Sequence, residues 1–140
     1  MGKYKKPHKR LHIWSIESDV YYLDEPYYCK KDKKVYEKKD LSMQQLESND
    51  YMELFTIDKI QCMHDFTKSI DTDDYTKYFG YLEHVDEEDR QSEFLAGFER
   101  LVTENWDYWG EYEKMLDDLF VEKVLKWCED NDIKYDKRYV

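Results

Sequence analysis

Histidines and cysteines occur in two pairs whose spacing could support chemistry. His8 and His12 lie four residues apart, the spacing that aligns two metal-binding imidazoles on one helix face. Pro7 precedes them and lysines surround them, which makes a helix there unfavourable. Cys62 and His64 lie two residues apart, so on a helix they point in different directions and cannot share one ion without outside ligands. We predict no metal site, with Cys62 in the core and His64 on the surface.

The chain lacks the short motifs that many catalytic sites require. It has no Gly-rich phosphate-binding loop and no Ser nucleophile elbow. A cysteine nucleophile would need a base such as His64 or His84 brought close by folding, and nothing in the local sequence favours that. The acidic run of Asp71, Asp73 and Asp74 lacks the Gly and the distal Glu of a calcium loop, and helix capping explains it. We therefore predict a protein that is not an enzyme and has no cofactor.

The chain is acidic, with a formal net charge of −11 over 140 residues. Residues 1–39 hold 11 Lys and Arg against 6 Asp and Glu, whereas residues 40–140 hold 11 against 27. An acidic body repels nucleic acid and attracts basic surfaces. We predict a partner protein with a basic surface and no direct nucleic-acid contact, except through the basic arm at about residues 1–10. The predicted binding surface consists of carboxylates at two expected helix starts: Asp71, Asp73, Asp74, Glu87, Glu88 and Asp89.

Composition indicates one folded domain over residues 1–140. Hydrophobic residues make up 41% of the chain and aromatic residues 17%, which is enough apolar surface for a core despite 39% charged residues. No apolar run approaches the roughly 18 residues of a membrane span. Three widely spaced cysteines favour a reducing compartment, so we predict a cytoplasmic protein. The 14 Tyr and 4 Trp either supply an exposed interface or replace Leu and Phe because of codon composition.

The amino-terminal part of the chain is expected to be β structure. Alternating apolar residues predict a strand over Leu11, Ile13, Trp14 and Ile16. Tyrosines and valines flank the polar segment KKDKK as two strands of a hairpin flank their turn. Asp40 is expected to cap a short helix over residues 41–48, and residues 51–57 are expected to be extended.

Helical periodicity dominates the rest of the chain. Asp58 is expected to start one helix, and residues 71–85 are expected to form another with Gly80 as its weak point. Two further helices complete the chain. The first should begin at the acidic residues 86–89 and end at Asn105, and the second should run from Trp106 to Asn131. Their apolar faces are predicted to form the core: Phe94, Leu95, Phe98, Leu101, Val102, Trp109, Tyr112, Leu116, Leu119, Phe120, Val124 and Trp127. The predicted fold class is α+β, with an N-terminal strand and hairpin packed on a mainly helical C-terminal part.

The closing segment, YEKMLDDLFVEKVLKWCEDNDIKYD, resembles the ending of a bacterial family of unknown function, uncharacterised protein family 0158. Members of that family end in an aromatic pair, a helix, a Trp followed by Leu or Cys, acidic residues, Asn and Ile. Residues in similar places here are Tyr112, Met115, Trp127, Cys128, Glu129, Asn131 and Ile133. The segment AGFERL is similar to a Gly, Ala, Phe and basic segment of the same family. The resemblance covers about the last third of the chain, and it implies a fold without an activity.

These patterns favour a non-enzymatic, acidic protein-binding module. In its sharpest form it is a phage-type inhibitor of the anti-CRISPR or anti-restriction class, which occupies a basic nucleic-acid-binding site of its partner. Arginine forks that bind phosphate accept carboxylates in the same bidentate geometry. Two alternatives stay open. One is a bacterial protein of the family above with a housekeeping or oligomeric structural role, and the other is a small hydrolase whose site assembles only on folding.

Overall fold

The computed structural model of the chain describes residues 10–137. His8 and most of the predicted basic arm lie outside the described residues. The described residues form two compact units: unit 1 comprises residues 10–57 and 120–137, and unit 2 comprises residues 58–119. The prediction of one domain over residues 1–140 stays a prediction. Among the described helices, none is apolar over a length that could cross a membrane.

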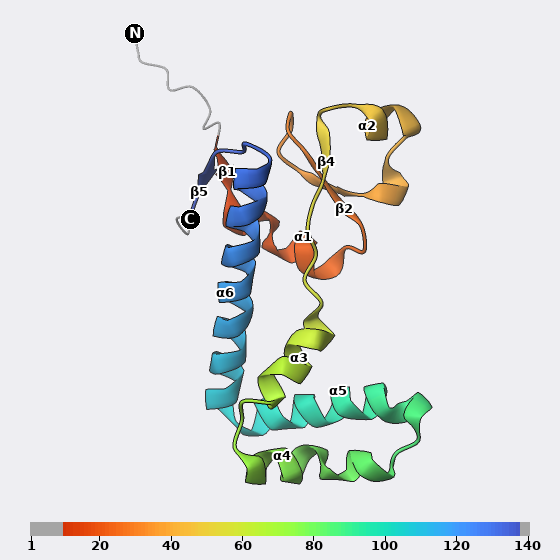
Figure 1. Ribbon diagram of the computed structural model, residues 1–140, viewed down its shortest axis with the longest axis vertical. Coiled ribbons are helices and arrows are strands. Elements are labelled where there is room, and N and C mark those ends of the chain that lie inside the picture. Colours follow the sequence, from red (N-terminus) through yellow and green to blue (C-terminus); the bar gives the residue numbers. More distant parts are fainter. Residues whose placement is uncertain (1–9, 138–140) are drawn as a thin grey trace. The chain divides into compact units, whose positions relative to one another are not determined.

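The fold is α+β, as predicted (Figure 1). The elements of unit 1 are, in chain order, β1 (Leu11–His12), the 3-10 turn η1 (Ile13–Ile16), α1 (Glu17–Tyr22), β2 (Pro26–Cys29), β3 (Val35–Glu37), η2 (Lys38–Asp40), α2 (Met43–Glu47), β4 (Tyr51–Glu53) and β5 (Tyr135–Asp136). Those of unit 2 are α3 (Lys59–Thr67), α4 (Thr72–Phe79), η3 (Gly80–His84) and α5 (Glu87–Glu104). The last helix, α6 (Trp106–Asp130), contributes residues 106–119 to unit 2 and residues 120–130 to unit 1.

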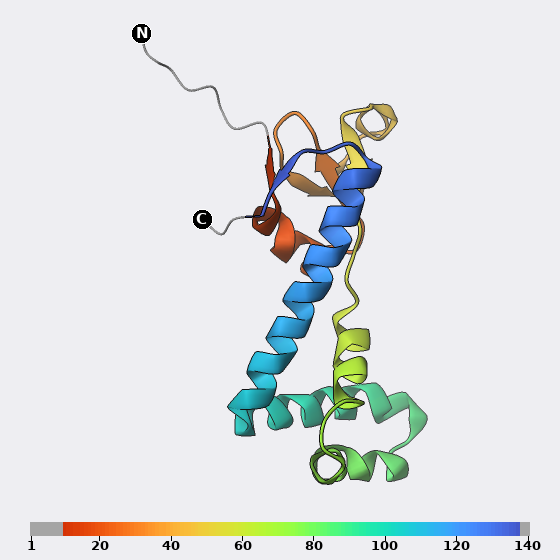
Figure 2. The ribbon, with the colours of Figure 1, turned by 60° about the vertical axis from the view of Figure 1, so that its left-hand side comes forward.

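Unit 1 contains a three-stranded antiparallel sheet in the order β3-β2-β4. The predicted hairpin is confirmed, with Tyr27 of β2 opposite Tyr36 of β3. Its turn has no Gly. Lys33 adopts the left-handed conformation there, with φ 61°, although this conformation is uncommon for residues other than Gly. The predicted extended segment is confirmed in β4, where Met52 lies opposite Tyr28. The short strands β1 and β5 form a separate parallel pair, and they lie side by side in both Figure 1 and Figure 2.

The carboxy-terminal half of α6 packs on this sheet through Trp127. The Trp127 side chain is 8% exposed, and its ring meets that of Tyr28 edge-on at 5.4 Å between centroids. Its indole Nε1 donates a hydrogen bond to the Glu53 carbonyl oxygen at 2.9 Å. Phe120 and Val124 are fully buried on the same helix. The prediction that the hairpin packs on a carboxy-terminal helix is confirmed within unit 1.

The strand predicted over Leu11 to Ile16 is wrong beyond His12. Ile13–Ile16 form a 3-10 turn, which α1 continues from Glu17. Ile13 and Ile16 are both buried, and residues three apart lie on one face of a 3-10 turn. The apolar spacing that looked like strand alternation is therefore that of a helical turn.

The short helix after the hairpin is confirmed as α2, but its predicted cap is wrong. Asp40 lies in η2, and Ser42 is the capping residue. The Gln45 backbone N–H donates to Ser42 Oγ at 3.1 Å, and the Ser42 N–H donates to Gln45 Oε1 at 2.8 Å. This reciprocal pair is a capping box, which satisfies two backbone donors that the first helical turn leaves open.

The helices of unit 2 begin and end close to the predicted residues. Asp58 caps α3 by accepting from the Gln61 N–H at 3.0 Å, and Asn105 ends α5. The helix predicted over residues 71–85 is interrupted at Gly80, its predicted weak point. The helix α4 ends at Phe79, and Gly80 begins the 3-10 turn η3. Figures 1 and 2 both show α4 beside α5.

The predicted apolar faces form the core of unit 2, with one clear exception. Phe94, Phe98, Leu101, Val102 and Tyr112 are buried, whereas Leu95, Leu116 and Leu119 are half-buried. Trp109 was predicted to be in the core, but its side chain is 37% exposed. The first turns of α6 therefore present two tryptophans to solvent, because Trp106 is exposed as well.

Candidate functional site

The acidic charge of the chain is concentrated in unit 2. Residues 58–119 hold 18 Asp and Glu against 6 Lys and Arg, a net charge of −12. The remaining residues hold 15 against 16, a net charge of +1, and together these give −11. Unit 2 is therefore the part of the chain whose field attracts positively charged groups.

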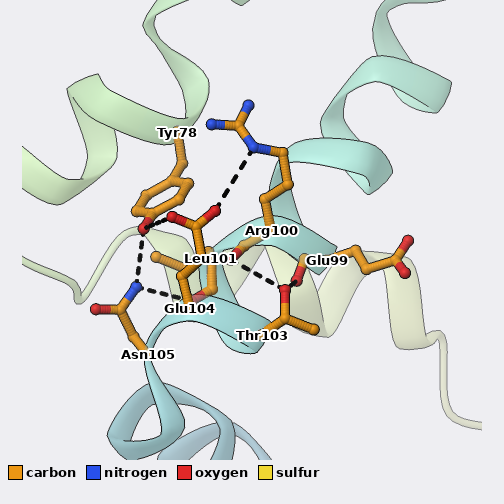
Figure 3. Close-up of polar contacts among 7 residues, drawn as sticks. All are labelled: Tyr78, Glu99, Arg100, Leu101, Thr103, Glu104 and Asn105. Carbon is orange, nitrogen blue, oxygen red and sulfur yellow. Dashed lines mark hydrogen bonds and ion pairs between the residues drawn. The ribbon is translucent and has the colours of Figure 1, made fainter.

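A polar network joins α5 to α4 at the point where α5 ends (Figure 3). The Tyr78 hydroxyl of α4 donates to Glu104 Oε1 at 3.1 Å and accepts from Asn105 Nδ2 at 3.1 Å. The same Asn105 amide donates to the Leu101 carbonyl oxygen at 2.9 Å. Arg100 Nε lies 3.8 Å from Glu104 Oε2. The carboxylate of Glu104 is thereby held in place by two neighbours.

A second contact ties the start of α4 to the first turn of α6. The Tyr108 hydroxyl donates to Asp74 Oδ2 at 2.6 Å. The hydrogen bond to this carboxylate, with burial as a smaller cause, raises the pKa of the Tyr108 hydroxyl. The protonated Tyr108 hydroxyl thereby ties the Asp74 side chain of α4 to the first turn of α6.

These contacts surround an open pocket of about 580 Å³. We call it the Trp106 pocket. Its lining residues are Asp74, Glu104, Asn105, Trp106, Asp107, Tyr108 and Glu111. Four of the seven are carboxylates, and no Lys or Arg is among these described lining residues. The Trp106 side chain is 74% exposed at the same place. Carboxylates beside an accessible indole suit a cationic group, which they can bind by ion pairing and by a cation–π contact.

Asp107 and Glu111 add a further argument for a cationic occupant. They lie four residues apart in α6, where like charges destabilise a helix by about 0.2–0.5 kcal/mol. Both are exposed. A bound cation between these carboxylates would relieve their mutual repulsion.

The six predicted site residues fall into two groups, which the structure does not bring together. Asp71, Asp73 and Asp74 lie at the start of α4, whereas Glu87, Glu88 and Asp89 lie in the first turn of α5. Figure 1 shows that these helix starts lie at opposite ends of the α4–α5 pair.

The two groups also differ in what their side chains do. Asp71 caps α4 by accepting from the Asp73 N–H at 2.8 Å, as helix capping predicted. Of the six, only Asp74 lines the Trp106 pocket. The carboxylates of Asp86, Glu88 and Asp89 come within 4.8 Å of one another, but all three are exposed. Acidic side chains at this position favourably oppose the helix dipole.

Sequence reasoning missed the residues that contribute most to the pocket. Glu104, Asp107 and Glu111 were not singled out, and Trp106 was noted only as the start of a helix. The like-charged spacing of Asp107 and Glu111 is the one signal in the sequence that could have indicated them.

Comparison with known proteins returned no relative. No protein-family model matches the chain, and neither a curated protein nor a solved structure matches it. The resemblance of the last third to uncharacterised protein family 0158 stays a prediction.

Proposed function

We propose that this protein is a non-enzymatic binding module whose acidic unit 2 docks onto a basic surface of another protein. The observation that carries the proposal is the net charge of −12 on residues 58–119, against +1 on the rest of the chain. A charge of one sign gathered on one unit steers an oppositely charged partner toward that unit.

The Trp106 pocket is the proposed anchoring point. Interfaces depend on a few residues that fill pockets, and arginine, tyrosine and tryptophan are the commonest of these. Here the exposed indole and four carboxylates offer both contacts that an arginine or lysine side chain makes. Glu104 and Asp74 are already positioned by hydrogen bonds, so less ordering is needed on binding.

In its finer form, the proposal is that the partner is a nucleic-acid-binding enzyme and that this protein is an inhibitor acting as a nucleic-acid mimic. Carboxylates would replace phosphates on arginine forks, as in the anti-CRISPR or anti-restriction class. The proposal includes a cytoplasmic location, where the buried thiols of Cys29, Cys62 and Cys128 stay reduced.

The first experiment uses the tagged full chain as bait in a cell lysate, with the captured proteins identified by mass spectrometry. The partner should be basic, and its capture should weaken as salt rises, because exposed charge interactions are screened within about 8 Å at physiological ionic strength. For the finer form, the partner's DNA or RNA should compete with this protein for one site.

Two charge-matched double variants locate the binding site. Asp107→Lys with Glu111→Lys reverses two pocket charges, and Asp24→Lys with Glu129→Lys reverses two exposed charges of unit 1. The pocket variant should bind the captured partner at least about tenfold more weakly, because like charges placed together across an interface cost several kcal/mol. Equal affinity of the two variants would place the docking surface elsewhere.

A further inference from the structure

A second pocket of unit 2, of about 590 Å³, lies at the other end of α5 and has an aromatic wall. His64 of α3 stacks on Phe94 of α5 with ring centroids 3.8 Å apart and planes 11° apart. His64 was predicted to be on the surface, but it is half-buried because of this stacking. Phe94 stacks in turn on Phe79 at 5.1 Å, and Tyr75 lies against Phe79 at 5.2 Å. We call this pocket the His64 groove.

The aromatic wall of the groove is partly accessible. Tyr75 is 42% exposed, and His64, Tyr75 and Phe94 all line the groove. A flat π surface open to solvent attracts a cation or another planar group.

The rim of the groove is acidic. Glu83 and Glu87 both line it. Among the described lining residues, Arg90 is the one Lys or Arg, and its Nη2 donates to the Val85 carbonyl oxygen at 3.0 Å. Five carboxylates between residues 83 and 89 outnumber this charge. The surroundings of the groove are therefore negative even with Arg90 present.

We propose that the His64 groove receives an arginine side chain of the basic partner. The inference rests on the proposed function and names one residue type that the partner must supply. A guanidinium is planar, so it can stack on the aromatic wall while its fork binds the carboxylates of Glu83 and Glu87. A lysine ammonium is a strongly hydrated point charge and makes only the second of these contacts well.

The test titrates the full chain with two peptides, blocked tri-arginine and blocked tri-lysine, at low salt. NMR signals of the His64 ring and of the Gln91 side-chain amide report on the groove, because both residues line it. The change in tryptophan fluorescence that is lost in Trp106→Phe reports on the other pocket, because the chain has three further tryptophans. Saturable shifts of the His64 and Gln91 signals are expected, with tri-arginine binding about two- to fivefold more tightly than tri-lysine, the range of one exposed cation–π contact.

Variants separate the two contacts. Tyr75→Ala should remove the preference for tri-arginine, and Tyr75→Phe should keep it, because the ring remains. Glu83→Gln with Glu87→Gln should weaken tri-arginine binding by about two- to tenfold, as expected for two exposed ion pairs. The matched control is Glu99→Gln with Glu113→Gln, which removes two exposed charges of unit 2 outside the groove. This control should leave the affinity for tri-arginine at the groove unchanged.

The outcomes distinguish this inference from the proposed function. If Trp106 responds to the peptides while the His64 and Gln91 signals do not, the groove inference is wrong and the proposed function stands. Equal binding of the two peptides at the groove also overturns the inference. If neither pocket responds and no basic partner is captured, the proposed function fails as well.

Discussion

At the scale of single residues, Gly97 shows how closely α5 approaches α4. A Cβ added at Gly97 would lie 2.8 Å from the Tyr78 carbonyl oxygen and 3.0 Å from the Phe79 ring. Gly110 in α6 offers a matched control, because nothing lies within 4 Å of a Cβ added there. Both substitutions to Ala gain the same helix propensity, about 1 kcal/mol.

We expect Gly97→Ala to be less stable than Gly110→Ala by about 1–3 kcal/mol, the usual penalty for overpacking a filled site. Because the propensity gain is common to both variants, it cancels in this comparison. Gly110→Ala itself should be more stable than the unsubstituted protein. Urea unfolding of the three proteins measures the differences, and equal stability of the two variants would show that α4 and α5 can move apart without loss.

Tyr28 predicts a dependence of stability on alkaline pH. Its side chain is buried, and burial, with the thiol of Cys128 as a smaller cause, raises the pKa of its hydroxyl to about 12. A tyrosine in an unfolded chain titrates near pH 10. Between these values the unfolded chain has lost the proton and the folded protein has kept it. The free energy of unfolding should therefore be unaffected by Tyr28 below about pH 10 and fall as the pH rises toward about 12.

The control for this prediction is Tyr28→Phe, which keeps the ring beside Trp127 and removes the titrating group. Urea unfolding at pH 9, 10 and 11 should show a steeper loss of stability for the unsubstituted protein than for Tyr28→Phe. Other tyrosines titrate in both proteins and cancel in the comparison. Parallel pH profiles would show that the Tyr28 hydroxyl reaches solvent without unfolding.

At the scale of elements, the cap of α2 can be tested directly. Ser42→Ala removes an N-cap hydroxyl, which costs about 1 kcal/mol, so amide hydrogen exchange in α2 should become about fivefold faster. Asp40→Ala, at the residue that sequence spacing favoured as the cap, should leave that exchange unchanged, because Asp40 lies in η2. The reverse result would restore Asp40 as the cap.

The elements that the sequence predicted well are those with a long or repeated pattern. The helices α5 and α6 bury their apolar side chains at helical spacing over many turns, and the hairpin has apolar residues on both sides of a polar turn. The segment from Leu11 to Ile16 is too short for spacing to separate a strand from a 3-10 turn. Trp109 was misplaced because amphipathic tryptophan fits the pattern whether it lies in the core or at its edge.

The candidate site could be predicted only in part, because it depends on how three helices meet. Asp74 was identified from a local acidic run, yet its partner Tyr108 lies 34 residues later in the sequence. Tyr78, which donates a hydrogen bond to Glu104, lies 26 residues before it in the sequence. Local spacing does not predict contacts between residues so far apart in the sequence. The sequence therefore indicated that the site is negatively charged but not where it lies.

At the scale of the whole molecule, the main feature is the unequal charge of the two units. Unit 2 carries −12 and the rest of the chain +1. In unit 2, the ion pairs of Asp65 with Lys68, Arg100 with Glu104 and Lys114 with Asp118 join residues three or four apart in exposed positions. Such pairs contribute little to stability. These pairs therefore give little reason for the acidic excess of unit 2, whose field attracts a basic surface.

The charge of unit 2 should act mainly on the rate at which a basic partner associates. Asp73→Lys, Glu87→Lys and Glu88→Lys reverse exposed charges of unit 2, and Asp24→Lys, Asp40→Lys and Glu129→Lys make the same change of net charge in unit 1. Asp74 is left out because it accepts a hydrogen bond from Tyr108.

Steering by charge raises association rates at low salt and fades as ions screen the field. In stopped-flow experiments with the captured partner, the unit 2 triple variant should associate about tenfold or more slowly at low salt, with a smaller difference at high salt and little change in dissociation. The unit 1 triple variant should associate at close to the rate of the unsubstituted protein. Equal slowing of both variants would mean that only the net charge matters, and no slowing of either would exclude an acidic docking surface on unit 2.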